Sequence, residues 1–177
     1  ISDGHGGTST ATVTVNVAAA NDAPVANPDA LAATEDTPAT YTAAQLLGND
    51  TDIDGNPLTI ASVTSGSGGS AVLNGDGTVT FTPGADFNGT ADFSYTVTDG
   101  TLTSNTATVS VTVAAANDAP VAVPVILVAM AEDSGARIIT QAELLANAGD
   151  VDGPALTATG LAISSGGGSL VDNGDGT

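Results

Sequence analysis

The 177-residue chain has no cysteine and only one basic residue, Arg137, against 20 acidic residues. The absence of cysteine excludes disulfides and thiolate chemistry. A net charge of −19 leaves no positive surface for nucleic acid and disfavours contact with an anionic membrane, so neither is an expected partner. The charge instead favours cations, because a chain this acidic repels itself unless counter-ions bind.

Aromatic residues and long apolar runs are also scarce. Aromatic residues make up 3% of the chain, and the longest apolar run, residues 121–131, is interrupted by Pro124. That run is too short to span a membrane, so no membrane insertion is expected. Apolar residues still make up 41% of the chain and alternate with polar ones, which argues against disorder. Because most are small, each folding unit has a thin core that needs support beyond apolar burial.

What the chain does contain is a repeat with a period of about 97 residues. AAANDAP occurs at 18–24 and 114–120, and TAAQLLGNDTDIDG (42–55) matches TQAELLANAGDVDG (140–153). A period of this length suits one independent domain per repeat. We expect the end of one repeat over 1–20, a complete repeat over 21–117, and the first part of a following repeat over 118–177. The chain is then a segment of a longer protein.

Small apolar residues alternate with threonine and serine in several segments, as in half-buried antiparallel strands. This pattern predicts strands at 79–81, 93–97 and 107–113, and another at 11–17. NGDG at 74–77 predicts a hairpin turn, and the glycine-rich stretches 65–70 and 164–169 suggest flexible loops. Residues 42–47 and 140–145 each predict one helical turn, capped by Thr42 or Thr140. Together these features predict an all-β fold of Greek-key β-sandwich repeats.

Acidic residues concentrate in short strings that recur with the repeat. Ca²⁺ takes six to eight hard oxygen ligands, and closely spaced aspartates beside a glycine supply several of them on one bent loop. The predicted ligands are Asn21, Asp22, Glu35, Asp52, Asp54, Asp99, Asn117, Asp118, Glu132, Asp150 and Asp152. Turn formation is the alternative for the linker pairs and DxD strings, and an exposed or capping role would equally suit Glu35.

Other residues favour simpler roles. Asp76 and Asp175 lie in NGDG and are predicted turn formers. Asp50 opens a DxDxDG string, but it has no aspartate counterpart in the following copy. His5 is the one histidine, so no catalytic triad is expected. The paired carboxylates lack an aromatic platform for sugars, and no phosphate-binding glycine loop is present, so the chain is predicted not to be an enzyme.

The order of TED (34–36), NDTDIDG (49–55), FNGT (87–90), YTVTDG (95–100) and NDAP (117–120) resembles bacterial cadherin-like tandem repeats. These are the VCBS and RTX-adhesin type repeats of giant extracellular surface proteins. The resemblance covers essentially the whole chain and implies Ig-like or cadherin-like sandwiches with Ca²⁺ at each junction. It assigns one junction to Glu35, Asn117, Asp118, Asp150 and Asp152, and the earlier junction to Asn21, Asp22, Asp52, Asp54 and Asp99. The family's mid-domain Asp-Arg-Glu motif has no clear match, and Asp86 is the nearest acidic residue.

These patterns predict Ca²⁺-stabilised extender repeats of a large extracellular adhesin, biofilm or filament protein at the cell surface. One alternative is a glycan-binding or homophilic module, which would need exposed aromatic residues. Another is a set of accessory repeats of a secreted enzyme. Expected partners are neighbouring repeats of the same chain, with strand addition between identical chains as an open alternative.

Overall fold

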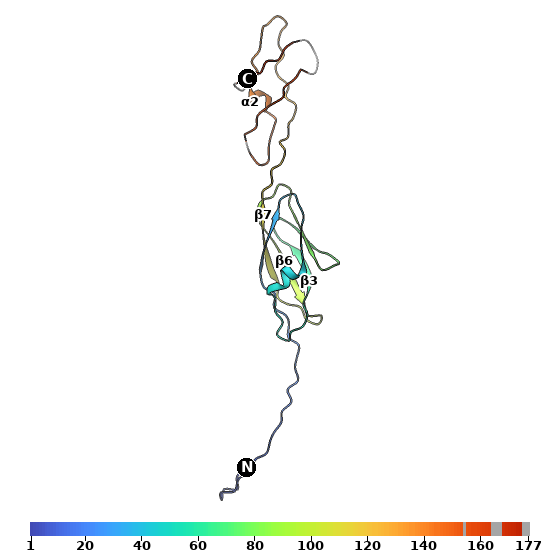
Figure 1. The fold of residues 1–177 in the computed structure, drawn as a ribbon, viewed down its shortest axis with the longest axis vertical. Helices are drawn as coiled ribbons and strands as arrows, with labels where there is room; N and C mark the ends of the chain where they lie inside the picture. The colour runs from blue at the N-terminus through green and yellow to red at the C-terminus, as the bar shows by residue number, and fades with distance from the viewer. Residues whose placement is uncertain (154, 164–167, 175–177) are drawn as a thin grey trace.

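Two facing β-sheets form between residues 29 and 114 of the computed structural model, which describes residues 1–153, 155–163 and 168–174 (Figure 1). The four-stranded sheet has the order β1 (Asp29–Thr34), β7 (Ala107–Ala114), β6 (Gly89–Thr98) and β3 (Thr59–Ser65). The three-stranded sheet has the order β2 (Ala39–Tyr41), β5 (Val79–Pro83) and β4 (Gly69–Leu73). The predicted all-β sandwich is confirmed.

Strand pairing decides which residues meet at the ends of the sandwich. β1 runs parallel to β7, with Asp29 opposite Val109 and Thr34 opposite Ala114. All other neighbouring strands are antiparallel, and β3 carries a bulge between Ile60 and Ser62. Because β1 and β7 end side by side, the residue that follows β1 lies against the linker that follows β7.

The core follows the period-two alternation. Inward residues of β7 are buried and outward ones exposed, and the sets predicted at 79–81 and 93–97 are buried as well. The ring of Phe93 stacks against Tyr41 at 6.5 Å and Phe81 at 6.1 Å. Leu46, in the helical turn α1 (Ala43–Leu46), is fully buried and closes the core beside the 3₁₀ turn η1 (Leu47–Asn49).

The strand predicted at 11–17 does not form. Val13, Val15 and Val17 are 83%, 77% and 89% exposed, although they match inward residues of β7 in the repeat. The reason is pairing: β7 lies between β1 and β6, whereas no described strand lies beside 11–17. Residues 9–20 instead extend away from the sandwich (Figure 1).

The glycine-rich segment 65–70 is a tight connection between β3 and β4 rather than a flexible loop. A Cβ on Gly69 would lie 2.5 Å from the carbonyl oxygen of Thr82 and 2.6 Å from Phe81, so only glycine fits against the sheet. Residues 164–167 of the matching stretch, and Asp175, lie outside the described residues. The NGDG turn is confirmed between β4 and β5, where Asp76 Oδ1 accepts from the Thr78 amide at 3.0 Å.

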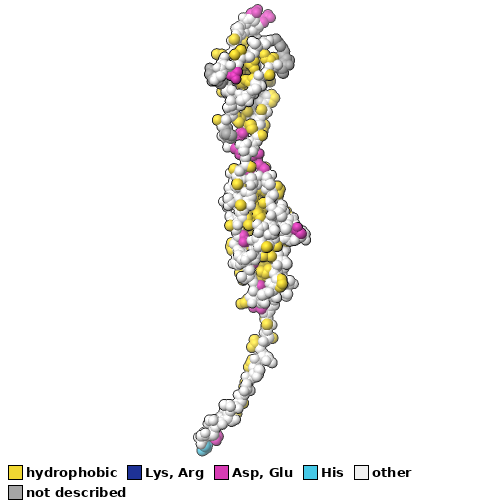
Figure 2. All heavy atoms as spheres, viewed as in Figure 1, with side chains coloured by type: hydrophobic (Ala, Val, Ile, Leu, Met, Phe, Trp, Pro, Cys, Tyr) yellow, Lys and Arg dark blue, Asp and Glu magenta, His cyan; other side chains and the backbone are white. Residues whose placement is uncertain are grey.

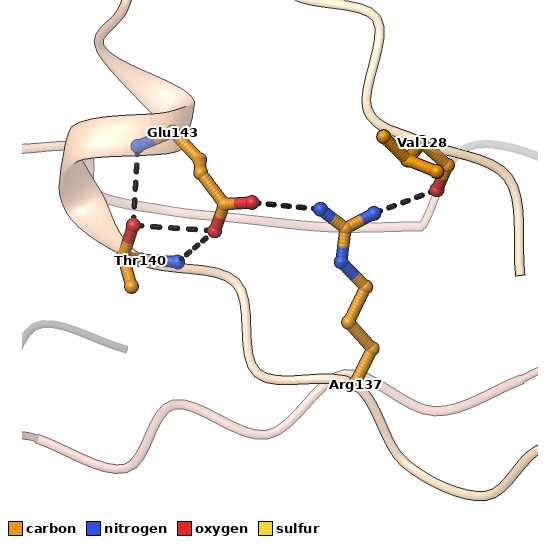
Figure 3. A network of polar contacts seen from close by, with 4 residues as sticks. All are labelled: Val128, Arg137, Thr140 and Glu143. Carbon is orange, nitrogen blue, oxygen red and sulfur yellow. Dashed lines mark hydrogen bonds and ion pairs between the residues drawn. The ribbon is translucent and has the colours of Figure 1, made fainter.

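The following copy reproduces the predicted helical turn as α2 (Gln141–Leu144), with Thr140 at its N-cap position as Thr42 is in α1. Thr140 N donates to Glu143 Oε2 at 2.9 Å, and Glu143 N donates to Thr140 Oγ1 at 3.2 Å. Arg137 donates to Glu143 Oε1 at 2.7 Å and to the Val128 carbonyl at 2.7 Å, which ties the turn to the preceding segment (Figure 3). No described helix has the length and apolar character needed to cross a membrane.

Candidate metal centre

Acidic side chains gather where the sandwich meets the following copy (Figure 2). We call this group the Asp118 cluster. The cluster contains two overlapping sets of three residues. Within each set, one side-chain oxygen from each residue lies within 4.8 Å of the other two. One set is Glu35, Asp118 and Asp152, and the other is Asp36, Asp86 and Asp118, so Asp118 belongs to both.

Glu35 is fixed by the parallel pairing of β1 with β7. It directly follows β1, its amide donates to the Ala114 carbonyl at 3.0 Å, and it is only 2% exposed. Its Oε1 accepts from the Ala116 amide at 2.6 Å, and its Oε2 accepts from Asn88 Nδ2 at 3.2 Å. A buried carboxylate needs such donors. Glu35 therefore holds the first residues of the linker against the sandwich.

Asp118 is the electrostatic centre of the cluster. Its Oδ2 is shielded from solvent and has no hydrogen-bond partner. Desolvation raises the pKa of Asp118, and repulsion from Asp36, Asp152, Asp86 and Glu35 raises it further. A carboxylate that lacks a donor and faces other carboxylates is in an unfavourable environment unless it binds a proton or a cation.

Two residues of the cluster, Asp36 and Asp86, were not among the predicted ligands. Both adopt left-handed backbone conformations, with φ of 58° and 53°, and the Asp86 amide donates to Asp36 Oδ1 at 3.2 Å. Aspartate tolerates this conformation better than most residues do. The available signals were the acidic string 34–36 and the position of Asp86 before FNGT. Asp133, the counterpart of Asp36 in the following copy, also has a positive φ of 57°.

The DxD loop of the following copy completes the Asp118 cluster. The Asp118 amide donates to Asp152 Oδ2 at 2.7 Å, and the Asp152 amide donates to Asp150 Oδ1 at 2.9 Å. The linker Asn117 donates from Nδ2 to the Asp118 carbonyl at 2.8 Å. These bonds bring Asp152 to the other carboxylates. Asp150 accepts a hydrogen bond within the loop and belongs to neither set.

The other end of the sandwich repeats this geometry in the Asp22 cluster, which comprises Asn21, Asp22, Asp52, Asp54 and Asp99. The Asp22 amide donates to Asp54 Oδ2 at 2.8 Å, and the Asp54 amide donates to Asp52 Oδ1 at 2.9 Å. Asp52 Oδ2 is shielded and has no hydrogen-bond partner. Asp22 and Asp52 line a surface hollow.

Asn21 links this loop to the turn after β6. Asn21 Nδ2 donates to Asp99 Oδ2 at 2.6 Å, and Asn21 Oδ1 accepts from Asn56 Nδ2 at 2.7 Å. The bond from Asn21, together with the amides of Leu102 and Thr101, lowers the pKa of Asp99. Asp99 is therefore an anion stabilised by hydrogen-bond donors, in contrast to Asp118.

The remaining acidic residues have separate roles. Glu132 is exposed and belongs to neither group of carboxylates in the described chain. Asp50 faces the sandwich, where Oδ1 accepts from the Asn27 amide at 2.7 Å and Oδ2 lies 3.1 Å from the Tyr95 hydroxyl. Asp50 therefore contacts the sandwich itself, whereas Asp54 accepts a hydrogen bond from the linker residue Asp22.

The composition of the Asp118 cluster fits a hard divalent cation. It offers carboxylate oxygens, the ligands that Ca²⁺ prefers, and one of them is shielded and has no hydrogen-bond donor. Among the described residues no basic side chain forms an ion pair with the cluster, because Arg137 pairs with Glu143. A cation is the missing positive charge that would relieve the crowding of these carboxylates.

Exposed aromatic residues, which a glycan-binding surface would need, are not found in the part of the chain that the structure describes. Tyr41, Phe81, Phe93 and Tyr95 are at most 5% exposed, and the half-buried Phe87 packs against the core. A Cβ on Gly68 would come within 2.6 Å of the Phe87 ring, which shows how closely that ring is enclosed.

The fold and the acidic joint define a class of protein: a β-sandwich repeat with carboxylates gathered where one unit meets the next. A family model described as a cadherin-like domain matches residues 20–114 and again 116–177. The chain therefore belongs to the cadherin-like domain family, and the predicted tandem arrangement is supported by the two matches.

No curated protein matches the chain. Among solved structures, an endo-fucoidan hydrolase variant from glycoside hydrolase family 107 is 26% identical with a TM-score of 0.39. The alignment covers 59% of this chain and 16% of that enzyme. The chain thus corresponds to a small part of that protein, and a TM-score of this size does not establish a shared fold.

Proposed function

We propose that these repeats are Ca²⁺-stabilised extenders of a large extracellular surface protein, in which the ion stiffens the joint between successive domains. The observation that carries the proposal is the Asp118 cluster, where carboxylates from three parts of the chain converge. Glu35, Asp36 and Asp86 come from the sandwich, Asp118 from the linker and Asp152 from the following copy. An ion held by all three parts would fix their relative orientation.

The expected energetic gain is large for a domain with a thin core. Extracellular Ca²⁺ modules have dissociation constants of about 10⁻⁴ M or weaker. At a free Ca²⁺ concentration of about 100 times the dissociation constant, each site adds about 2.7 kcal/mol to folding stability. The core is built mainly of alanine and valine, so this contribution is a substantial part of a typical stability of about 5–15 kcal/mol.

The proposal supplies a reason for the extreme charge of the chain. Carboxylates crowded at the joints repel one another, so the ion-free chain bends or loosens there, whereas the ion-bound chain is straight and resistant to unfolding. The family supports an extracellular location, where calcium is abundant. The adhesin, biofilm and filament roles remain part of this proposal.

The test is to titrate Ca²⁺ into the EDTA-treated 177-residue chain, following thermal unfolding and small-angle scattering. We expect a higher melting temperature and a larger radius of gyration with Ca²⁺. Mg²⁺ is the control, because it demands octahedral geometry and dehydrates reluctantly, so it should have a smaller effect. Identical melting and scattering curves in EDTA and Ca²⁺ would refute the proposal.

A further inference from the structure

We propose that Asn88 is a site of spontaneous covalent modification, at which its amide converts to a carboxylate beside Glu35. Asn88 directly precedes Gly89, and it is an exposed residue. Its Nδ2 lies 3.2 Å from Glu35 Oε2. The conversion would replace the donor to a buried carboxylate by another carboxylate. Only the effect on the cation response rests on the proposed function; the reaction itself does not.

The reaction needs only water. The main-chain nitrogen of Gly89 attacks the side-chain carbonyl carbon of Asn88, and a new carbon–nitrogen bond closes the ring. The bond from that carbon to Nδ2 breaks, and Nδ2 leaves as ammonia with the proton that the Gly89 amide gives up. Water then opens the resulting cyclic imide to aspartate or isoaspartate, and the proton count balances. Glycine favours the attack because it has no side chain to obstruct the ring. The space beside Gly89 is also open, since a Cβ placed there would meet nothing within 4 Å.

The complete repeat contains a matched comparison at Asn74–Gly75. The Asn74 side chain donates to Thr78 Oγ1 and Thr80 Oγ1, both at 2.9 Å, and its amide donates to the Thr78 carbonyl at 2.8 Å. Asn74 is therefore held inside the hairpin turn between β4 and β5. Asn88 has one side-chain bond, to Glu35, so its carboxamide is freer to reach the geometry of attack.

The product has opposite effects on the two states of the joint. Without a cation, Glu35 loses a donor and gains a like charge, which destabilises a carboxylate that is 2% exposed. With a divalent cation, the new carboxylate is a stronger hard ligand than the amide it replaces. Conversion at Asn88 thus makes the joint more dependent on the cation as the protein ages.

The experiment has two parts and uses the 177-residue chain. First, the wild-type chain is incubated in EDTA, and peptide mass spectrometry follows the mass change from amide to acid at Asn88 and Asn74. Second, Asn88→Asp, which reproduces the aspartate product, is compared with Asn74→Asp as the matched control and with Asn88→Gln, which reacts far more slowly. Thermal unfolding of each is recorded in EDTA and in Ca²⁺.

We expect several-fold faster conversion at Asn88 than at Asn74. Asn88→Asp should unfold at a lower temperature than wild type in EDTA and gain more from Ca²⁺, while Asn74→Asp keeps the wild-type gain. Equal or slower conversion at Asn88 would overturn the inference, as would an Asn88→Asp chain whose EDTA stability matches wild type. If wild type itself does not respond to Ca²⁺, the proposed function fails, but the conversion rates and the EDTA comparison still decide this inference.

Discussion

The two ends of the sandwich share one linker and loop geometry but differ in their electrostatics. In both clusters a linker aspartate donates its amide to the second aspartate of a DxD loop, at 2.8 Å for Asp22 and 2.7 Å for Asp118. Only Asp118 also faces carboxylates of a folded domain on its other side, namely Glu35, Asp36 and Asp86. Both candidate sets of the described chain lie at the Asp118 end, and neither includes a residue of 1–20.

This difference separates two contributions to the candidate site. Local sequence is enough to shape the linker and DxD loop, because both copies adopt the same hydrogen bonds. Crowding of the carboxylates depends on the end of an adjoining sandwich, which brings Glu35 to the linker through the pairing of β1 with β7. The loop is thus one half of a site, and a folded neighbour provides the other half.

The largest expected effect concerns Glu35, which has no counterpart at the Asp22 end of the described chain. Glu35→Ala leaves the Ala116 amide without its acceptor, which should cost about 1–3 kcal/mol of folding stability even in EDTA. Urea denaturation in EDTA measures this cost. Glu35→Gln is the matched control, because it keeps an oxygen that can accept from Ala116 and should lose less.

The outcome would sharpen the role of Glu35. A stability loss for Glu35→Ala that appears only in Ca²⁺ would mean that Glu35 acts purely as a ligand. Equal losses for the alanine and glutamine variants would show that charge, rather than the hydrogen bond to the linker, is what matters.

A smaller effect should distinguish the two linker aspartates. Asp118→Asn removes the residue common to both sets, so the Ca²⁺ affinity measured from ion-dependent melting should fall by at least about tenfold. Asp22→Asn should reduce the affinity less, because no described residue before Asn21 adds a carboxylate to its cluster. Asp118→Asn should not melt below wild type in EDTA, since it also relieves repulsion. Equal affinity losses at the two positions would contradict the comparison.

Much of the fold could be predicted from the sequence, because alternating residues and turn motifs act locally. The buried faces of β5, β6 and β7, the NGDG turn and the two capped helical turns were predicted correctly. The strand at 11–17 was not, because alternation identifies a strand only when partners are present. The prediction of a flexible loop over 65–70 was wrong, because it depended on local sequence alone. The close approach of the glycines at 66, 68 and 69 to Asp92, Phe87 and Phe81 is a tertiary feature.

The candidate site shows the same limit. Recurrence identified Glu35, Asp118 and Asp152, which the structure brings together. Asp36 and Asp86 were missed because their meeting depends on two left-handed residues 50 positions apart, joined by one hydrogen bond. No local pattern encodes that contact. Whether these residues bind a metal stays a prediction, to be tested by the experiments above.

The smallest expected effect is a pH dependence in EDTA with opposite signs at the two ends. The raised pKa of Asp118 means that the folded chain binds this proton more tightly than the unfolded chain, in which the aspartate pKa is near 3.8. Stability should therefore rise as the pH falls from neutrality through the folded pKa of Asp118 towards 3.8. Asp99, whose pKa is lowered, contributes stability above 3.8 that is lost as the pH falls through its folded pKa.

Urea midpoints measured across this range in EDTA should thus pass through a maximum. Asp118→Asn should remove the rise in stability on acidification, and Asp99→Asn should weaken the fall at lower pH. Each variant thus identifies the residue that contributes to one side of the maximum. Ca²⁺ should also suppress the rise, because a bound cation keeps Asp118 ionised. A stability that only declines from neutrality in EDTA, with no change in Asp118→Asn, would show that the crowding at Asp118 is relieved without a proton or a cation. The two ends of the sandwich would then be electrostatically alike.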